Sequence, residues 1–357
     1  MKHFCLYLVA WLALGISLIL TGGDVQAQAM NKTSVFGAMT IPDDPLVIKV
    51  GIEVEQITSV DQKSENFGAV STIRMEWHDP ALAYDPAVVG GEVKVMAPPD
   101  FIELATSLST IVPSFSIQNQ QGNRWIQNDL VIIHPDGTAR YLERSSLTLQ
   151  APYFNFRRYP FDRQVFFFEI VSHYPSNIVQ FVPDAEFSGL GELLGEEEWI
   201  LNNPEMVLSE TRGISGLESP QIALKFHGHR HRQYYLTRIF LPILVLVAVS
   251  WSVFFLDGYR KRSEVAGANL LVFVAFNWVI SDELPKLGYL TFLDFILQWM
   301  FVVTGLIVVI NVFLSRLKAN GRESLAIMLD DYVFRWVYPV GYLGIVLFGI
   351  SHFLILY

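Results

Sequence analysis

The hydrophobic pattern of the chain changes once, near residue 233, from short alternating runs to long continuous ones. Before that point, apolar and polar residues alternate over short stretches bounded by turn-forming residues, a pattern typical of half-buried β-strands. After it, four apolar stretches each have the length that a helix needs to cross a bilayer. The pattern therefore predicts an all-β domain followed by a helical membrane domain.

Residues 41–233 are expected to form a two-sheet, immunoglobulin-like β-sandwich. Residues 47–60 and 67–77 are predicted strands joined by a polar turn, and residues 139–149 follow the hairpin signal His134-Pro135-Asp136-Gly137. The membrane domain is expected to span residues 234–357. Its predicted helices are residues 236–256, 263–281, 291–315 and 332–356.

Basic residues orient these helices. Positive charge gathers at Arg260-Lys261-Arg262 and again at Arg316, Lys318 and Arg322, so both loops are expected on the cytoplasmic side. Residues 1–27 resemble a signal peptide, with an uncleaved anchor as the alternative, and residues 28–40 are read as a linker. The β domain and the C-terminus are then periplasmic, in the inner membrane of a cell.

Composition excludes several classes of function. Hydrophobic residues make up 52% of the chain, and the formal net charge of −10 argues against nucleic-acid binding. No nucleophile elbow, zinc-binding HExxH or glycine-rich phosphate loop is present, so an enzyme and a bound cofactor are not expected. The only cysteine, Cys5, lies in the predicted signal peptide, which leaves no thiolate metal site in the mature chain.

The second apolar stretch carries an unusual stripe. Helical spacing from Glu264 places small residues and two acids on one face. A helix acidic at both ends of one stripe and apolar elsewhere can line a pore; alternatively, it is a buried helix whose Glu264 pairs with Arg260 or Arg262. The stripe consists of Glu264, Ala268, Leu271, Ala275, Trp278 and Asp282.

Four motifs of the chain, taken together, resemble those of the pentameric ligand-gated ion channels, the Cys-loop receptor superfamily. Tyr159-Pro160-Phe161-Asp162-Arg163-Gln164 resembles the signature loop, and Pro242 follows Tyr234-Tyr235 as in the family's first span. Leu284-Pro285-Lys286 resembles the link between the second and third spans, and Trp77 to Leu82 resembles the second strand and its turn. Pro152 and Phe166 stand where the loop's cysteines would fall, so the chain looks like a bacterial member.

The resemblance implies a homopentamer in membrane lipid, with the second span lining a pore. Five copies of Glu264 would form a selectivity ring that favours monovalent cations. Leu271 is the expected gate and Trp278 a second one. The alternatives are an anion channel, suggested by the basic triplet, and a non-conducting envelope sensor.

By resemblance, a proton or a small molecule would act between subunits. One subunit would offer Phe115, His173, Tyr174 and Arg212, and its neighbour Thr72, Arg74 and Tyr141. For Phe115 and Tyr141, sandwich core is an equal alternative. His227, His229 and His231 alternate along a strand and are weak candidates for a metal or proton site, against the commoner solvated strand edge.

Coupling between the two domains is also implied by the resemblance. Arg232 is expected to pair with Asp162 of the signature loop. Asp61 and the loop residues Tyr159, Pro160 and Phe161 are expected to rest on Pro285 and Lys286. Opening would then be a population shift between two packed states.

Overall fold

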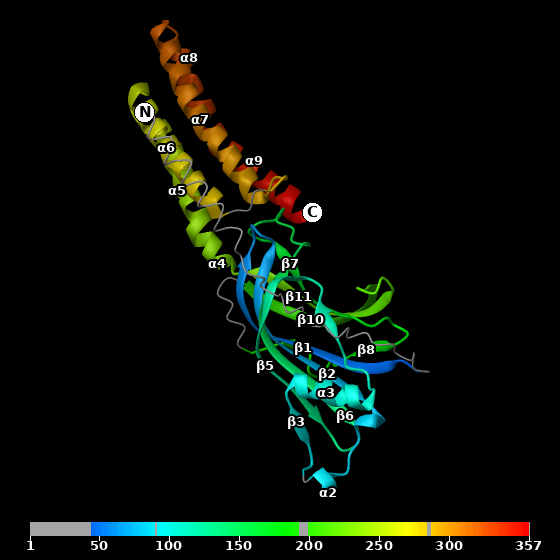
Figure 1. Ribbon diagram of the computed structural model, residues 1–357. Coiled ribbons are helices and arrows are strands. Elements are labelled where there is room, and N and C mark those ends of the chain that lie inside the picture. Colours follow the sequence, from blue (N-terminus) through cyan, green and yellow to red (C-terminus); the bar gives the residue numbers. More distant parts are fainter. Residues whose placement is uncertain (1–43, 90, 193–198, 284–286, 357) are drawn as a thin grey trace, which may run out of the picture. The chain divides into compact units, whose positions relative to one another are not determined.

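The computed structural model describes residues 44–89, 91–192, 199–283 and 287–356, which belong to one compact unit, Asp43–Tyr357 (Figure 1). The predicted signal peptide and linker lie outside the described residues, as do Pro285 and Lys286. The side chain of Asp282 is likewise not described, although its backbone belongs to a helix.

The N-terminal half is a sandwich of two β-sheets, as predicted. The larger sheet has the order β3-β5-β6-β2-β1-β8, with β9 also paired to β1. Its strands are β1 (Leu46–Asp61), β2 (Asn66–His78), β3 (Lys94–Met96), β5 (Gln120–Ile133), β6 (Thr138–Gln150), β8 (Val179–Pro183) and β9 (Gly189–Leu190). The smaller sheet has the order β10-β11-β7-β4. Its strands are β4 (Phe115–Ile117), β7 (Arg163–Ser172), β10 (Trp199–Arg212) and β11 (Glu218–Arg230).

Aromatic rings from both sheets fill the space between them. Phe67 of β2 meets Phe166 of β7 edge to face at 5.1 Å, and Phe166 stacks on Phe226 of β11 at 5.2 Å. All three side chains are fully buried. Burial of each ring contributes about 2–3 kcal/mol, and the edge-to-face geometry adds to this. The sandwich is therefore held by a continuous aromatic core.

Three short helical segments interrupt the sandwich, where the sequence analysis predicted only β structure. They are η1 (Pro80–Leu82), α2 (Pro86–Val89) and α3 (Pro98–Leu108). Proline opens α3, where a missing N–H costs nothing, and Ser109 ends it in the left-handed region at φ 56°. Phe101 of α3 packs on Trp77 of β2 with ring centroids 5.7 Å apart.

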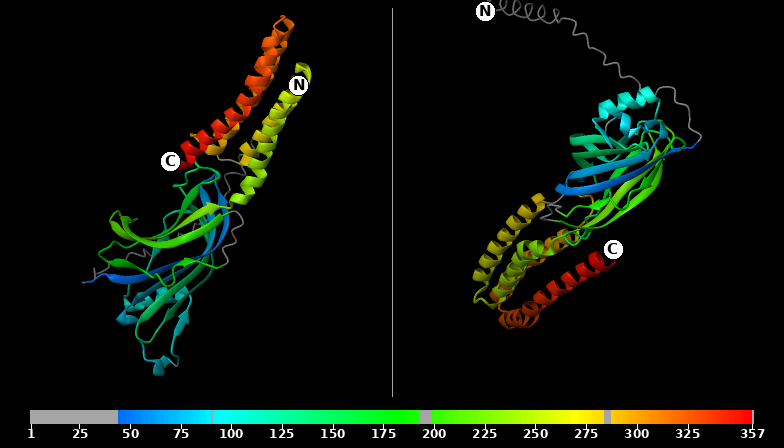
Figure 2. Two further views of the ribbon diagram at one scale, coloured as in Figure 1. Left: turned by 180° about the vertical axis from the view of Figure 1, so that it is seen from behind. Right: turned by 90° about the horizontal axis from the view of Figure 1, so that it is seen from below.

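The C-terminal half contains four helices long and apolar enough to span a membrane. The first runs from Arg232 to Phe255 and the second from Tyr259 to Ser281. The third is Phe292–Ala319, and the fourth, Glu323–Ile355, starts before the predicted residue 332. Figures 1 and 2 show these helices running alongside one another.

Local sequence explains where the helices begin and bend. Their elements are α4 (Arg232–Tyr235), η2 (Leu236–Phe240), α5 (Leu241–Ser252), η3 (Val253–Phe255), α6 (Tyr259–Glu283), α7 (Phe292–Ala319), α8 (Glu323–Met328), η4 (Leu329–Phe334), α9 (Arg335–Gly349) and η5 (Ile350–Ile355). Pro242 lies in the first turn of α5, directly after the widened turn η2. Proline has no N–H to donate to the preceding helical turn, which is why the helix widens there. Thr291 and Asp294 cap α7 reciprocally.

Candidate pore, ligand and coupling sites

The predicted stripe of α6 lies within the part of the helix that the rest of the chain leaves uncovered, together with Val272, Val274 and Val279. Leu271 and Trp278 are 72% and 80% exposed, whereas Phe273 on another face is 1% exposed. Ala268 and Ala275 are exposed as well. In a membrane, an uncovered face of a long apolar helix can meet lipid, a partner chain or a pore. The stripe is therefore available to line a channel.

The packed face of α6 carries a polar anchor. Asn269 is 6% exposed, and its amide donates to the carbonyl oxygen of Leu246 at 3.0 Å and to the hydroxyl of Ser250. Both partners belong to α5. Hydrogen bonds of this kind fix one helix against another within a bilayer. They orient α6 so that the stripe points away from α5.

The side chains of Arg260 and Arg262, in the basic triplet before this stripe, point in different directions. Arg262 is 7% exposed and donates to both carboxylate oxygens of Asp330 in η4, at 2.7 and 2.6 Å. Arg260 contacts Glu264 at 3.1 Å, with their side chains 93% and 64% exposed. An exposed pair of this kind is worth about 0–1 kcal/mol, so Arg260 holds Glu264 only weakly. Arg262 faces the last helix and not the uncovered stripe.

The signature loop is joined to the sandwich by a buried ion pair. Arg230, at the end of β11, donates to Asp162 at 3.1 Å, and their side chains are 0% and 1% exposed. The guanidinium also lies 4.1 Å from the ring centroid of Trp199 and donates to the Tyr235 hydroxyl at 3.0 Å. The prediction that Arg232 pairs with Asp162 is wrong. Arg232 begins α4 and is exposed.

The signature loop also contacts the membrane helices directly. The N–H of Phe156 donates to the Tyr289 hydroxyl at 3.1 Å, and the N–H of Phe292 donates to the carbonyl of Arg157 at 2.9 Å. Phe161 stacks on Phe240 with centroids 5.7 Å apart and meets Phe292 at 6.0 Å. The loop therefore touches the first helix and the start of α7.

Other predicted coupling residues have local roles in the structure. The peptide bond between Tyr159 and Pro160 is cis, and the Tyr159 ring lies edge to face with Tyr235 at 5.6 Å. Asp61 accepts hydrogen bonds from the N–H groups of Lys63 and Ser64 and so closes the turn between β1 and β2. The expected contact with Pro285 and Lys286 lies outside the described residues.

Two of the predicted ligand residues are brought together on the smaller sheet. Phe115 of β4 pairs with Ser172 of β7. Next to that pair, the His173 ring nitrogen Nδ1 lies 2.7 Å from the Ser114 hydroxyl. Burial lowers the pKa of the His173 imidazole, which favours its neutral form. Tyr174 is 3% exposed and packs in the core.

Arg212 lies where the sequence analysis expected a hairpin. Strands β10 and β11 form that hairpin, with Arg212 opposite Glu218. The side chain of Arg212 donates back to the carbonyl of Gly216 at 3.0 Å. The arginine thus stabilises the turn of its own hairpin and is exposed at the end of β10.

Tyr141 does not share a face with Thr72 and Arg74. In the pairing of β2 with β6, Tyr141 lies opposite Met75, whereas Arg74 lies opposite Leu142. Side chains alternate between the two faces of a sheet, so Tyr141 points into the sandwich. There its ring meets Phe115 of the same chain at 6.1 Å. The expectation that Tyr141 faces a neighbouring subunit is wrong, and the core alternative holds for it.

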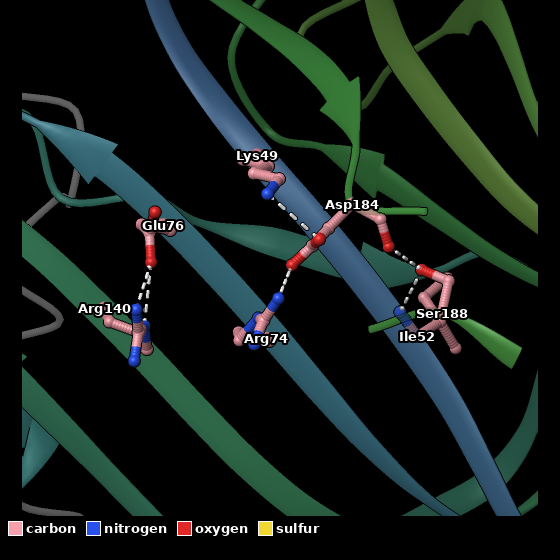
Figure 3. A network of polar contacts seen from close by, with 7 residues as sticks. All are labelled: Lys49, Ile52, Arg74, Glu76, Arg140, Asp184 and Ser188. Carbon is pink, nitrogen blue, oxygen red and sulfur yellow. Dashed lines mark hydrogen bonds and ion pairs between the residues drawn. The ribbon is translucent and has the colours of Figure 1, made fainter. Parts of the chain in front are cut away.

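Ion pairs cover the outer face of the larger sheet around Thr72 and Arg74. Figure 3 shows Asp184, just after β8, between Lys49 of β1 and Arg74 of β2. In the same view Arg140 of β6 donates twice to Glu76 of β2, at 2.6 and 2.8 Å. A second group lies farther along the strands, where Thr72 and Arg144 both donate to Glu55.

Asp184 is the buried member of this surface. Its side chain is 1% exposed, against 43% for Lys49 and 22% for Arg74. Burial alone would raise the pKa of the Asp184 carboxyl, but hydrogen bonds from Arg74 and Lys49 lower it below the ordinary value of 3.8. Ser188 adds a link, because it donates to the Asp184 carbonyl at 2.7 Å and accepts from the Ile52 N–H at 3.1 Å (Figure 3).

The Asp184→Asn variant is expected to lose about 1–2 kcal/mol at pH 7, since two half-exposed cations lose their anionic partner. A carboxyl with a lowered pKa contributes its stability above its unfolded value and loses it as pH falls through the folded value. The deficit relative to wild type should thus be constant from pH 7 to about pH 4 and shrink at lower pH. Unfolding midpoints of both proteins across this range measure it. A deficit that grows in acid would contradict the assignment.

The alternating histidines keep the predicted pattern but do not form a metal site. His227 and His229 are half-buried on one face of β11, and His231 follows the strand. Burial and the nearby charges of Arg163 and Arg232 lower the pKa of His229. Among the described residues, no three side chains of histidine, cysteine, aspartate or glutamate are close enough to hold a metal ion.

Comparison of the sequence with known protein families agrees with the fold and with the position of the signature loop. A profile of the neurotransmitter-gated ion-channel ligand binding domain matches residues 35–232. The match covers more than half of the 357 residues, and the chain belongs to the pentameric ligand-gated ion-channel family. Members of this family are ion channels and not enzymes.

Two relatives show what kinds of channel the chain is similar to. It is 28% identical over 309 residues to the proton-gated ion channel of Gloeobacter violaceus, covering 85% of this chain and 82% of the relative. It is 26% identical over 298 residues to the glutamate-gated chloride channel subunit beta of Haemonchus contortus, covering 77% of this chain and 66% of the relative. The two relatives differ in the ion or agonist named for them.

Several residues of the site were missed by the sequence analysis. Arg230, Trp199 and Tyr289 meet the signature loop, and Asp184 and Asp330 supply the anions that bind Arg74 and Arg262. One signal was available for Arg230. If His227 and His229 face outward, then residue 230 must point inward with Phe226 and Gly228.

Proposed function

We propose that the chain forms a homopentameric, cation-selective channel in the inner membrane, opened by a proton or a small molecule acting on the periplasmic sandwich. The uncovered α6 stripe carries this proposal. Five copies of this helix around an axis would present Glu264 as a carboxylate ring, with Leu271 and Trp278 as successive apolar constrictions. Monovalent cations are the expected permeant ions, and membrane lipid is expected to cover the outer helix faces.

Electrostatics favours cations over anions at this ring. Glu264 lies on the uncovered stripe, and Arg260, the cation that it contacts, is itself 93% exposed. Arg262 does not add positive charge to the stripe, because it is buried against Asp330. The alternative, an anion channel, rests on Lys261, for which no ion pair is recorded within the described residues, and on the chloride-channel relative.

Current through purified protein in planar bilayers tests the selectivity. In a tenfold KCl gradient, wild type is expected to reverse near the potassium potential, roughly 60 mV from zero. Glu264→Gln should move the reversal towards zero because the ring loses its charge. Glu323→Gln removes an exposed cytoplasmic-side carboxylate away from α6 and should leave the reversal unchanged. Reversal near the chloride potential, unaffected by Glu264→Gln, would favour the anion channel.

The agonist site is proposed to lie between subunits. Phe115, His173 and Arg212 would come from one chain, and Thr72 with Arg74 from its neighbour. Support comes from the neighbouring pairs Phe115–Ser172 and Ser114–His173 on the smaller sheet and from the outward position of Thr72 and Arg74 on the larger one. Stepping the outer pH during the same recordings separates a proton agonist from a small molecule. No conductance from a folded pentamer would favour the non-conducting sensor.

A further inference from the structure

A pocket within one chain lies beside β7, apart from the pore and from the proposed agonist residues. Its volume is about 200 Å³. The residues that line it come from the turn before β5, from the end of β6 and the residues after it, and from β7. They include Gln118, Asn119, Gln150, Tyr153, Phe167 and Glu169.

The pocket contains the carboxylate of Glu169. Glu169 is half-buried, and burial raises the pKa of its carboxyl. Within the described residues no lysine, arginine or histidine forms an ion pair with Glu169, whereas Glu55, Glu76 and Glu143 each have one. A half-buried carboxylate without a partner costs free energy that a bound cation would recover.

The backbone around Glu169 is fixed by Asn119. The side-chain oxygen of Asn119 accepts from the Glu169 N–H at 3.2 Å. Its amide nitrogen donates to the carbonyls of Gln150 at 3.1 Å and Phe167 at 2.7 Å. Asn119 is 8% exposed and thus ties β7 to the end of β6. The walls of the pocket are preformed, so a ligand need not order them.

Two aromatic rings complete the pocket. Tyr153 and Phe167 lie edge to face, with centroids 5.5 Å apart and planes at 67°. Tyr153 is 67% exposed, so its ring is open to a ligand. Aromatic faces attract weakly hydrated organic cations by about 0.5–2 kcal/mol each. A hard metal ion would need several oxygen ligands, which one carboxylate does not supply.

We propose that this pocket binds a small organic ammonium ion, held by the Glu169 carboxylate and the rings of Tyr153 and Phe167. The site is built by a single chain and is independent of the proposed pore and its selectivity. Glu169 lies on β7, four residues before His173, and four residues of extended chain span about 13 Å. A bound cation would therefore lie nearer the Arg163 end of β7 than the proposed agonist residues and not among them.

Isothermal titration of the purified full-length protein tests the site with two ligands of equal size. Tetramethylammonium carries the charge, and tert-butanol has the same number of heavy atoms without it. Wild type is expected to bind tetramethylammonium saturably and to give no saturable heat with tert-butanol. Glu169→Gln and Tyr153→Leu should each weaken the binding about tenfold or more, whereas Tyr153→Phe should retain it because the ring remains.

Two controls locate the binding. Glu103→Gln removes an exposed carboxylate on α3 and should leave the affinity unchanged. Glu264→Gln should also leave it unchanged; if that variant abolishes binding and Glu169→Gln does not, the ion binds in the pore and the proposal is overturned. Equal binding of tert-butanol, or no saturable binding, also overturns it. If Glu169→Gln fails to fold, the pair Tyr153→Leu and Tyr153→Phe at an exposed position decides.

Discussion

Replacing Arg230 with methionine is expected to lower the free energy of unfolding by about 3–5 kcal/mol. The change leaves Asp162 charged and 1% exposed without its cation. It also removes the guanidinium that lies over Trp199 at 4.1 Å and donates to Tyr235 at 3.0 Å. Thermal unfolding of the assembled protein should show a midpoint lower by roughly 5–15 °C.

Arg232→Met is the matched control, because it removes the same charge two residues away. Arg232 is exposed, so its loss should change the free energy by no more than about 0.5 kcal/mol. Equal losses for both variants would contradict the assignment of Arg230 as the partner of Asp162. In the double variant Arg230→Met with Asp162→Leu, part of the stability should return, since no uncompensated charge remains.

The Arg230 variant should also reduce channel current in protein that still assembles. The pair Arg230–Asp162 holds the signature loop, and that loop bonds to Tyr289 and Phe292 at the start of the third helix. Loosening the loop weakens a hydrogen-bonded connection between the sandwich and α7. Current per assembled pentamer, compared with the Arg232 control, measures this coupling separately from stability.

Replacing Arg262 with methionine is expected to have a similarly large effect in the membrane domain, about 3–5 kcal/mol. Arg262 donates to both oxygens of Asp330 at 2.7 and 2.6 Å and to the carbonyl of Leu256 at 2.6 Å. Its loss leaves Asp330, which is 6% exposed, charged among helices. The fraction of protein that remains pentameric during heating in detergent measures the effect.

Lys261→Met is the control for the second substitution, because Lys261 is exposed and adjacent. It should leave thermal stability unchanged. The same pair of variants also separates structure from permeation: Arg262→Met should preserve the reversal potential of any current that remains. A large shift in reversal with no loss of stability would show instead that Arg262 faces the ions.

Local periodicity made much of the architecture predictable. Alternation with a period of two gave the strands of the sandwich. Four long apolar stretches gave the spanning helices within four residues of their observed ends, except that the fourth helix begins nine residues earlier than predicted. The residues from Glu264 to Trp278 that the spacing placed on one face are exposed within the chain. Each of these features depends on residues close together in the sequence, and a single repeat length describes them.

The predictions that failed concern partners far apart in the chain. Asp162 takes Arg230 and not Arg232 because the register of β11 turns residue 230 inward, while residue 232 already belongs to a helix. Tyr141 points into the sandwich because β6 pairs with β2 in a register that places it opposite Met75.

The sequence by itself therefore determined a β-sandwich joined to four membrane helices and the stripe of residues on one face of α6. Only the tertiary structure decided that Arg262 joins Asp330, 68 residues away, and that Arg74 joins Asp184. The physical reason is that hydrophobic periodicity is a property of neighbouring residues. An ion pair, in contrast, depends on strand register and helix packing, which bring distant residues within about 3 Å of each other.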